Sequence, residues 1–176
     1  GSEKKFNLLN ELDSLDIAGQ TKVIRADISE THSFKPSYSI GDRTRSYLKI
    51  QDGCDYVCSF CTIPLARGKS RNDSIKKTIQ LANQAIQEGA KELVLTGVNI
   101  GDFGKSSNES FLSLIQELDK LDIERLRISS IEPNLLSKEI INFCSSSKKF
   151  MPHFHIPLQS GSDKILTLMR RRYKRS

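Results

Sequence analysis

Three of the four cysteines stand close together in the chain, as Cys54, Cys58 and Cys61 in a C-x3-C-x2-C spacing. Thiolates are soft ligands that suit zinc ions or iron–sulfur clusters. A structural zinc ion usually takes four protein ligands as two separated pairs, and the sequence holds no second C-x2-C pair. Three thiolates on a four-iron cubane instead leave one iron open to a substrate. The spacing therefore favours an iron–sulfur cluster, with a zinc site as the alternative.

The same three thiols would share one face if they lay on a helix, and they would then be inert core residues. Gly53 before the triplet and Pro64 after it leave too little room for a long helix, which disfavours that interpretation. Cys144 stands at helical spacing with apolar neighbours and is predicted to be buried rather than to bind a metal. His153 and His155 alternate on an expected strand, so they face opposite ways and cannot jointly hold one ion.

The apolar pattern predicts four strand-then-helix units. Strands are expected at residues 47–50, 92–96, 126–129 and 153–158, and helices at residues 75–86, 111–121, 137–144 and 162–169. Ser137 and Ser162 are predicted to cap the last two helices. This repeated order predicts an α/β fold with a parallel sheet and right-handed crossovers.

Residues suited to ligand binding follow each expected strand. In parallel sheets, ligands gather at the carboxyl ends of the strands. The cysteine-containing segment, residues 54–61, follows the first strand, and the turn at residues 97–99 follows the second. Ser130 and Glu132 follow the third strand, and residues 159–161 lie at the end of the fourth. The sequence therefore predicts a single active site at one edge of the sheet.

Residues 3–42 are less regular than the remainder. Leu8, Leu9, Leu12 and Leu15 form a short helical stripe, and Val23-Ile24 is expected to be extended. The segment 31–42 is rich in Ser, Thr, Pro and Gly, which is typical of a linker. The sequence therefore predicts a short N-terminal part, residues 3–42, and a core, residues 43–176.

The chain has 176 residues, with 27 Lys and Arg against 21 Asp and Glu, a formal net charge of +6 and a pI near 9.2. A basic balance permits an anionic partner such as RNA. No apolar run approaches the roughly 20 residues of a membrane span, and no signal peptide opens the sequence. Clustered thiols without a signal peptide favour a reducing compartment, so the expected location is the cytoplasm.

The cysteine triplet, with Phe60 just before the last cysteine, resembles the signature of the radical S-adenosylmethionine (radical SAM) family. Residues 50–54 and 63–71 resemble the methylthiotransferase branch of that family, as do three further segments, at residues 95–99, 128–133 and 155–163. Within this branch, Gln51-Asp52 and residues 96–101 are most similar to the enzymes that modify threonylcarbamoyladenosine in tRNA. The alternatives are enzymes acting on isopentenyladenosine in tRNA or on a ribosomal protein, and a non-catalytic zinc or RNA-binding module.

This resemblance implies an open, partial (β/α) barrel of the TIM type, truncated after about four βα units. Cys54, Cys58 and Cys61 would hold a [4Fe-4S] cluster whose open iron binds the amino and carboxylate groups of S-adenosylmethionine. An electron from a donor such as flavodoxin or ferredoxin would cleave the sulfonium to a 5′-deoxyadenosyl radical. The residues implied to line the cofactor are Phe60, Gly97, Val98, Asn99, Ser130, Glu132, Gln159 and Ser160.

The resemblance also implies that the chain is a fragment. Complete methylthiotransferases resemble a three-part protein, with an N-terminal domain for a second [4Fe-4S] cluster, the radical core and an RNA-binding barrel. The fragment is expected to be inactive alone in methylthiolation, and its open sheet edge is expected to favour self-association. The basic run 170–175, and Arg67, Lys69 and Arg71, are candidate contacts for tRNA phosphates. For the run, the alternative is a solvated helix end.

Overall fold

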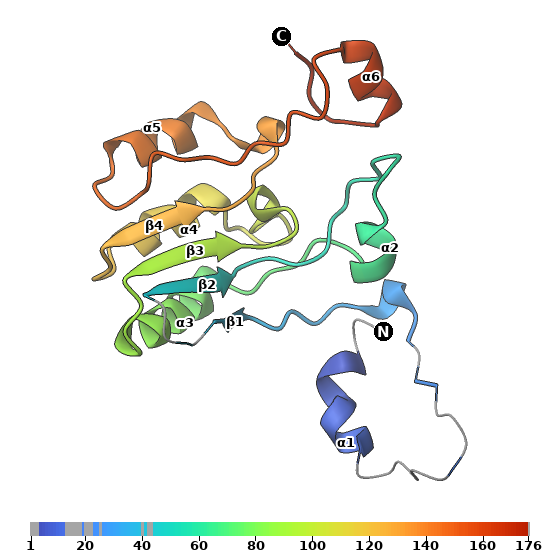
Figure 1. The fold of residues 1–176 in the computed structure, drawn as a ribbon, viewed down its shortest axis with the longest axis horizontal. Coiled ribbons are helices and arrows are strands. Elements are labelled where there is room, and N and C mark those ends of the chain that lie inside the picture. Colours follow the sequence, from blue (N-terminus) through green and yellow to red (C-terminus); the bar gives the residue numbers. More distant parts are fainter. Residues whose placement is uncertain are drawn as a thin grey trace.

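The computed structural model describes residues 4–12, 19, 23–24, 26–39, 41 and 44–175. It contains one four-stranded sheet in the order β1-β2-β3-β4 (Figure 1). The strands are β1 (Ser37–Tyr38), β2 (Arg45–Lys49), β3 (Glu92–Thr96) and β4 (Arg125–Ile128). Strands β2, β3 and β4 pair in parallel as predicted, whereas β1 pairs antiparallel with β2. The sheet is therefore mixed and open, consistent with a partial TIM-like α/β fold.

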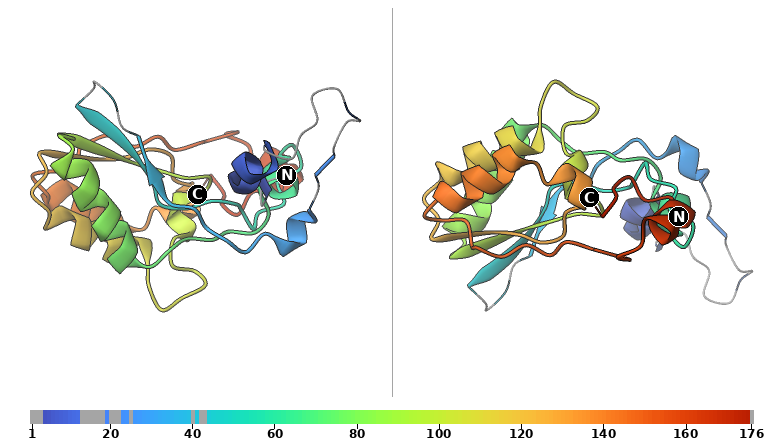
Figure 2. Two further views of the ribbon diagram at one scale, coloured as in Figure 1. Left: turned by 90° about the horizontal axis from the view of Figure 1, so that it is seen from below. Right: turned by 90° about the horizontal axis from the view of Figure 1, so that it is seen from above.

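Each of the three parallel strands is followed by a helix of nine residues or more. These helices are α3 (Ile75–Gln87), α4 (Phe111–Asp119) and α5 (Lys138–Ser146), and they lie side by side over one face of the sheet (Figure 2). Each begins where a serine hydroxyl accepts a hydrogen bond from a backbone N–H three residues later, which satisfies a free donor of the first turn. The three capping residues are Ser74, Ser110 and Ser137. The predicted helices over residues 75–86, 111–121 and 137–144 are thus confirmed.

The core lies between the sheet and these helices. Leu48, Leu93, Leu95 and Leu126 are fully buried within it. Along β2 and β4 buried and accessible residues alternate, because successive strand side chains point to opposite faces. On the other face the flanking strands β2 and β4 carry accessible side chains, whereas β3 is buried on both faces, with Glu92 and Val94 covered.

The helix α5 buries Cys144 among apolar side chains, as predicted. Burial raises the pKa of the Cys144 thiol to about 11, with a further contribution from Asp119. Because the thiolate is the reactive form, we expect iodoacetamide at pH 8 to leave Cys144 unmodified in the folded protein and to alkylate it in urea. Peptide mass spectrometry of the two samples tests this. Equal labelling of Cys144 in both would contradict it.

The predicted strand at residues 153–158 is wrong. This segment makes one parallel bridge, between Ser130 and His155, and a second bridge joins Leu126 to Phe150 just before it. Pro152 precedes the segment and Pro157 lies within it, and neither has an N–H to donate to a ladder, which prevents a continuous strand.

The last predicted helix is confirmed as α6 (Asp163–Leu168). Ser162 occupies its N-cap position, but its side chain makes no capping hydrogen bond. Several short elements were not predicted: α2 (Ile63–Arg67) and the 3-10 turns Lys4–Asn7, Ile28–Glu30, Ile100–Asp102 and Pro133–Leu135.

The N-terminal helix α1 (Leu8–Leu12) lies away from the sheet (Figure 1). It confirms part of the predicted leucine stripe, whereas Leu15 lies outside the described residues, and so does the predicted division between residues 42 and 43. Val23-Ile24 belongs to neither a strand nor a helix, and β1 interrupts the predicted linker. Across the described residues, no helix has the length and apolar character needed to cross a bilayer.

Candidate cofactor site

The cysteine loop, residues 53–61, leaves the carboxyl end of β2. A backbone bridge between Asp52 and Arg71 closes its base, and the Cys54 amide donates to the Gly68 carbonyl at 3.0 Å. Gly53 has a φ of +72°, and a Cβ there would collide with backbone atoms of the returning chain, so this position requires glycine. The loop is irregular rather than helical, so the interpretation of its thiols as one face of a core helix is wrong.

Gln51 joins the cysteine loop to the turn after β3. Its side chain is fully buried. Its amide nitrogen donates to the Gly53 carbonyl at 2.7 Å and to the Ser70 hydroxyl at 2.9 Å. Its amide oxygen accepts from the backbone N–H groups of Val98 at 2.9 Å and Asn99 at 2.8 Å. One side chain therefore fixes two of the predicted site segments relative to each other, a role that no local pattern in the sequence indicates.

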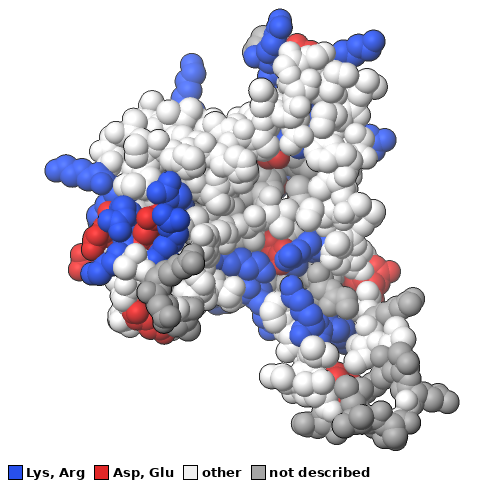
Figure 3. All heavy atoms as spheres, viewed as in Figure 1, with Lys and Arg blue, Asp and Glu red and all other residues white. Residues whose placement is uncertain are grey.

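The three cysteines line one cavity of about 170 Å³ at the carboxyl edge of the sheet. Five other predicted site residues share it: Phe60, Val98, Asn99, Glu132 and Gln159. Three residues that sequence reasoning missed complete the lining: Tyr56, Ile63 and Arg171. In Figure 3 the surface is hollowed between the body of the sheet and helices and the part that carries α6. The edge therefore brings together most of the predicted site.

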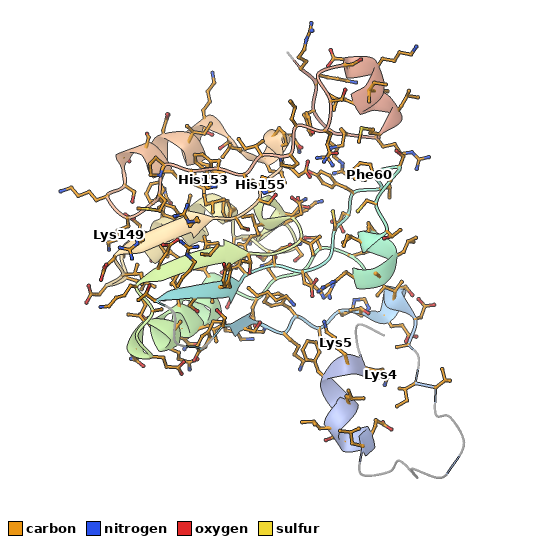
Figure 4. The ribbon with its side chains drawn as sticks, in the orientation of Figure 1. Lys4, Lys5, Phe60, Lys149, His153 and His155 are labelled. Atoms are coloured by element: carbon orange, nitrogen blue, oxygen red, sulfur yellow. The ribbon has the colours of Figure 1, made fainter. Side chains whose placement is uncertain are left out.

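Three predicted site residues do not line this cavity. Gly97 lies next to it, in the same turn as Val98, where an added Cβ would come within 2.9 Å of the Gln51 carbonyl oxygen. Ser130 instead forms an isolated parallel β-bridge with His155 through its backbone. The hydroxyl of Ser160 accepts from the Ser162 amide at 3.1 Å. Figure 4 shows Phe60 beside the chain that leads to α6, with His155 further back along that chain.

Arg171 is the cation of this cavity. Its side chain is only 4% exposed and forms an ion pair with the Glu132 carboxylate. Its Nη1 also donates to the Cys58 sulfur at 3.4 Å. Burial alone would lower the pKa of the guanidinium, but the hydrogen bond and charge of Glu132 raise it, so the group remains cationic. The predicted role of Arg171 as an RNA phosphate contact is therefore wrong, because the side chain is enclosed.

The chain after α6 also supports the cysteine loop. The Ser59 amide donates to the Met169 carbonyl at 3.2 Å. The Arg172 guanidinium lies 3.9 Å from the centre of the Tyr56 ring and donates to the Asp55 carbonyl at 3.2 Å. A cation over an aromatic face is attracted by the negative face of the ring. Part of the basic run therefore holds the site together rather than forming a solvated helix end.

Asp52 anchors the base of the cysteine loop. Its buried carboxylate pairs with Lys49 at 2.7 Å, Arg67 at 3.3 Å and Arg71 at 3.3 Å. Arg71 is 12% exposed and also donates to the Arg67 and Ser33 carbonyls, so its predicted role as a phosphate contact is wrong. Burial alone would raise the pKa of Asp52, but Lys49, the Gly53 amide and Arg71 hold it below its ordinary value.

We expect Asp52→Asn to lower the free energy of unfolding by about 3 kcal/mol at pH 7, because three cations lose a buried partner. Since the folded-state pKa of Asp52 is below 3.8, its contribution is complete above that pH and is lost as the pH falls further. The difference in the free energy of unfolding between wild type and variant, measured by urea titration, should therefore become smaller below pH 3.8. A difference in the free energy of unfolding that does not change with pH would show that the ionised Asp52 carboxylate is not its source.

The donor types in the cavity are those of a thiolate-bound cluster, although within the described residues no three His, Cys, Asp or Glu side chains are gathered closely enough to hold a metal ion. Cys54, Cys58 and Cys61 are free thiols. The Tyr56 amide donates to the Cys54 sulfur at 3.4 Å and Arg171 donates to that of Cys58, as expected where sulfur carries negative charge. Burial raises the pKa of the Cys54 thiol, more than the Tyr56 amide lowers it. Binding a cluster there must therefore release a proton.

Two lining residues also have a buried polar atom without a hydrogen-bond partner in the described part of the chain. They are the acceptor Oδ1 of Asn99 and the donor Nε of Arg171. Buried polar groups are normally paired, so unpartnered ones point to a missing ligand. An ammonium and a carboxylate group, as in an amino acid, are the partners that these two atoms lack, and because both atoms are covered in this structure, neighbouring side chains must shift for a ligand to reach them. The chemistry of the lining, three thiols beside an unpaired acceptor and an unpaired donor, is therefore of the kind that an amino-acid ligand beside thiol-bound metal would need.

The fold and the cavity define an α/β domain with a three-cysteine cofactor site at the carboxyl edge of its sheet. A family model described as the radical SAM superfamily matches residues 48–176, and the chain belongs to that superfamily. The family implies a [4Fe-4S] cluster and S-adenosylmethionine as cofactors.

Among curated relatives, the chain is similar to tRNA methylthiotransferases. It is 38% identical over 98% of its length to threonylcarbamoyladenosine tRNA methylthiotransferase MtaB of Bacillus subtilis (strain 168). It is 35% identical over 99% to MtaB of Thermotoga maritima. It is 33% identical over 99% to the tRNA-2-methylthio-N(6)-dimethylallyladenosine synthase of Orientia tsutsugamushi (strain Ikeda). The chain spans 40% of the length of each of these relatives.

Proposed function

We propose that this chain is the radical SAM core of a tRNA-modifying methylthiotransferase that acts on N6-threonylcarbamoyladenosine next to the anticodon. The observation that carries the proposal is the single cavity lined by three free cysteines and by Asn99 and Arg171, each with an unpartnered buried atom. The relatives named for this modification, similar over nearly the whole chain, support the choice of substrate.

Cys54, Cys58 and Cys61 would hold the [4Fe-4S] cluster, and the rest of the cavity would bind S-adenosylmethionine. When bound, this pair supplies a one-electron cleavage of the sulfonium as the source of radical chemistry. Asn99 Oδ1 would accept from the ammonium group of the cofactor, and Arg171 Nε would donate to its carboxylate. These residues thus orient the methionyl end.

Other lining residues would hold the nucleoside end of the cofactor and exclude water. Phe60 and Val98 supply the apolar surface of the cavity, and Gln159 supplies an amide for the ribose hydroxyls. Gly97, Ser130 and Ser160 would contribute from positions next to the cavity. Glu132 would act through its ion pair with Arg171.

The remaining parts of the activity belong to a longer protein in this proposal. Residues 3–42 would be the end of an N-terminal domain with a second [4Fe-4S] cluster, the source of sulfur, and residues 43–176 would be the core. A one-electron donor such as flavodoxin or ferredoxin would reduce the core cluster in the cytoplasm. The exposed Lys69 and the exposed part of the run 170–175 would contact tRNA phosphates. Pairing of the open sheet edge with a second copy would explain any dimer of the fragment.

Anaerobic reconstitution with iron and sulfide tests the proposal. Electron paramagnetic resonance of the reduced protein should show a four-iron signal that shifts when S-adenosylmethionine is added, and dithionite should then yield 5′-deoxyadenosine. Multiple-turnover assays of the fragment alone should give no methylthiolated tRNA. Retention of zinc in place of iron would overturn the proposal in favour of a binding module. A cluster that does not respond to the cofactor would also contradict it.

A further inference from the structure

A second cavity, of about 440 Å³, lies next to the cofactor cavity. This pocket, here called the sheet-face pocket, is formed by residues from β1, β2 and the end of β3, and by Arg67 of α2. Its volume falls in the ordinary range of small-molecule sites. Val98 lines both cavities, so they meet at the turn that follows β3. A molecule in the sheet-face pocket would therefore lie directly beside the proposed cofactor.

The sheet-face pocket carries an excess of positive charge. Lys49 and Arg67 line it, and both pair with Asp52, whose carboxylate also pairs with Arg71. One negative charge therefore faces three positive charges. The Lys49 and Arg67 side chains remain 21% and 40% exposed, so each can bind a further anion. Figure 3 shows Lys and Arg side chains gathered between the body of the molecule and the part below it.

The pocket also offers a surface for a nucleobase. Tyr47 lines it, and half of this residue is exposed. Exposed tyrosine rings stack on unpaired bases of RNA, which is the usual way proteins hold a base that has been turned out of its strand. The hydroxyl groups of Ser37 and Thr96, also in the lining, can hydrogen-bond to polar substituents of such a base.

We propose that the sheet-face pocket binds the modified adenine of the substrate, with Lys49 and Arg67 binding the carboxylate of its threonylcarbamoyl group. This inference rests on the proposed function and adds the residues that choose the substrate. A dimethylallyl group is apolar and uncharged, so it would offer these cations no anion beyond the Asp52 carboxylate that they already share, and it would cover their exposed parts with apolar surface. The cations of this pocket therefore select threonylcarbamoyladenosine over dimethylallyladenosine.

Three nucleosides test the inference on the reconstituted chain with S-adenosylmethionine bound. They are N6-threonylcarbamoyladenosine, its carboxyl methyl ester and N6-dimethylallyladenosine, with dissociation constants measured by calorimetry. The free acid should bind about tenfold more tightly than the ester, since charge-assisted hydrogen bonds are roughly twice as strong as neutral ones. Added salt should weaken the binding of the acid more than that of the ester.

Lys49→Met should bring the affinity for the acid close to that for the ester. Lys76→Met, which removes the same charge from the exposed face of α3, should leave the ratio unchanged. Arg67→Met provides a second test if loss of Lys49 impairs folding, which thermal denaturation would reveal. Equal binding of acid and ester by the wild type, or tighter binding of dimethylallyladenosine, would overturn the inference. The shift of the four-iron signal on addition of S-adenosylmethionine does not depend on that result, so it tests the proposed function independently.

Discussion

A Cys58→Ala variant is expected to retain less than about a tenth of the iron that the wild-type chain takes up on anaerobic reconstitution. Cys58 is the buried member of the triplet and receives the hydrogen bond from Arg171. With only two thiolates left, a cubane has two irons without a protein ligand and exchanges them with solvent. Iron and acid-labile sulfide assays measure the loss directly, and the four-iron resonance should disappear with it.

Cys144→Ala is the matched control. This thiol is also buried, but it lies in α5 among apolar side chains and does not line the cofactor cavity. Its removal should leave iron content and the resonance signal unchanged, with a small loss of stability. Full iron content in the Cys58→Ala variant would contradict the assignment of the cluster ligands, and so would loss of iron from Cys144→Ala alone.

Local patterns in the sequence predicted the elements that local forces determine. The strand at residues 92–96 and the helix that Ser74 caps agree with the structure, because apolar spacing and a capping hydroxyl act within a few residues. The rule that ligands lie at the carboxyl ends of strands placed the cysteine loop and the turn 97–99 in one site, and the three cysteines share one cavity with Val98 and Asn99 of that turn.

The contacts that complete the site could not be predicted in this way, because they join residues far apart in the chain. Gln51 reaches the turn after β3, and Arg171 reaches Glu132 and Cys58 from beyond α6. A run of basic residues looks the same in a sequence whether its members are solvated or enclosed. The prediction of a strand at residues 153–158 was wrong for a different reason, because it gave more weight to the apolar residues than to Pro152 before the segment and Pro157 within it.

Arg171→Met is expected to lower the affinity for S-adenosylmethionine by about tenfold or more, because it removes the Nε donor that we propose for the cofactor carboxylate. The same change leaves the Glu132 carboxylate without its partner, which we expect to lower the free energy of unfolding by about 3 kcal/mol. Loss of affinity in this variant alone would therefore not separate a direct contact with the cofactor from damage to the fold.

A double-mutant cycle with Glu132→Gln separates the two effects. In the double variant no carboxylate is left unpaired, so most of the lost stability should return. If Arg171 acts only by positioning Glu132, adding Arg171→Met to Glu132→Gln will leave cofactor affinity unchanged. If Arg171 binds the cofactor itself, the double variant will bind about tenfold more weakly than Glu132→Gln, as calorimetry on the reconstituted proteins would show.

The reduction potential of the cluster gives an independent measurement on the same variants. The Arg171 cation donates to the Cys58 sulfur, and a hydrogen bond or positive charge at a ligand sulfur favours the reduced, more negative cluster. Arg171→Met should therefore shift the midpoint potential to a more negative value without the cofactor present, and Arg171→Lys should shift it less. An unchanged potential would show that the guanidinium does not interact with the cluster ligand, even if the affinity for the cofactor falls.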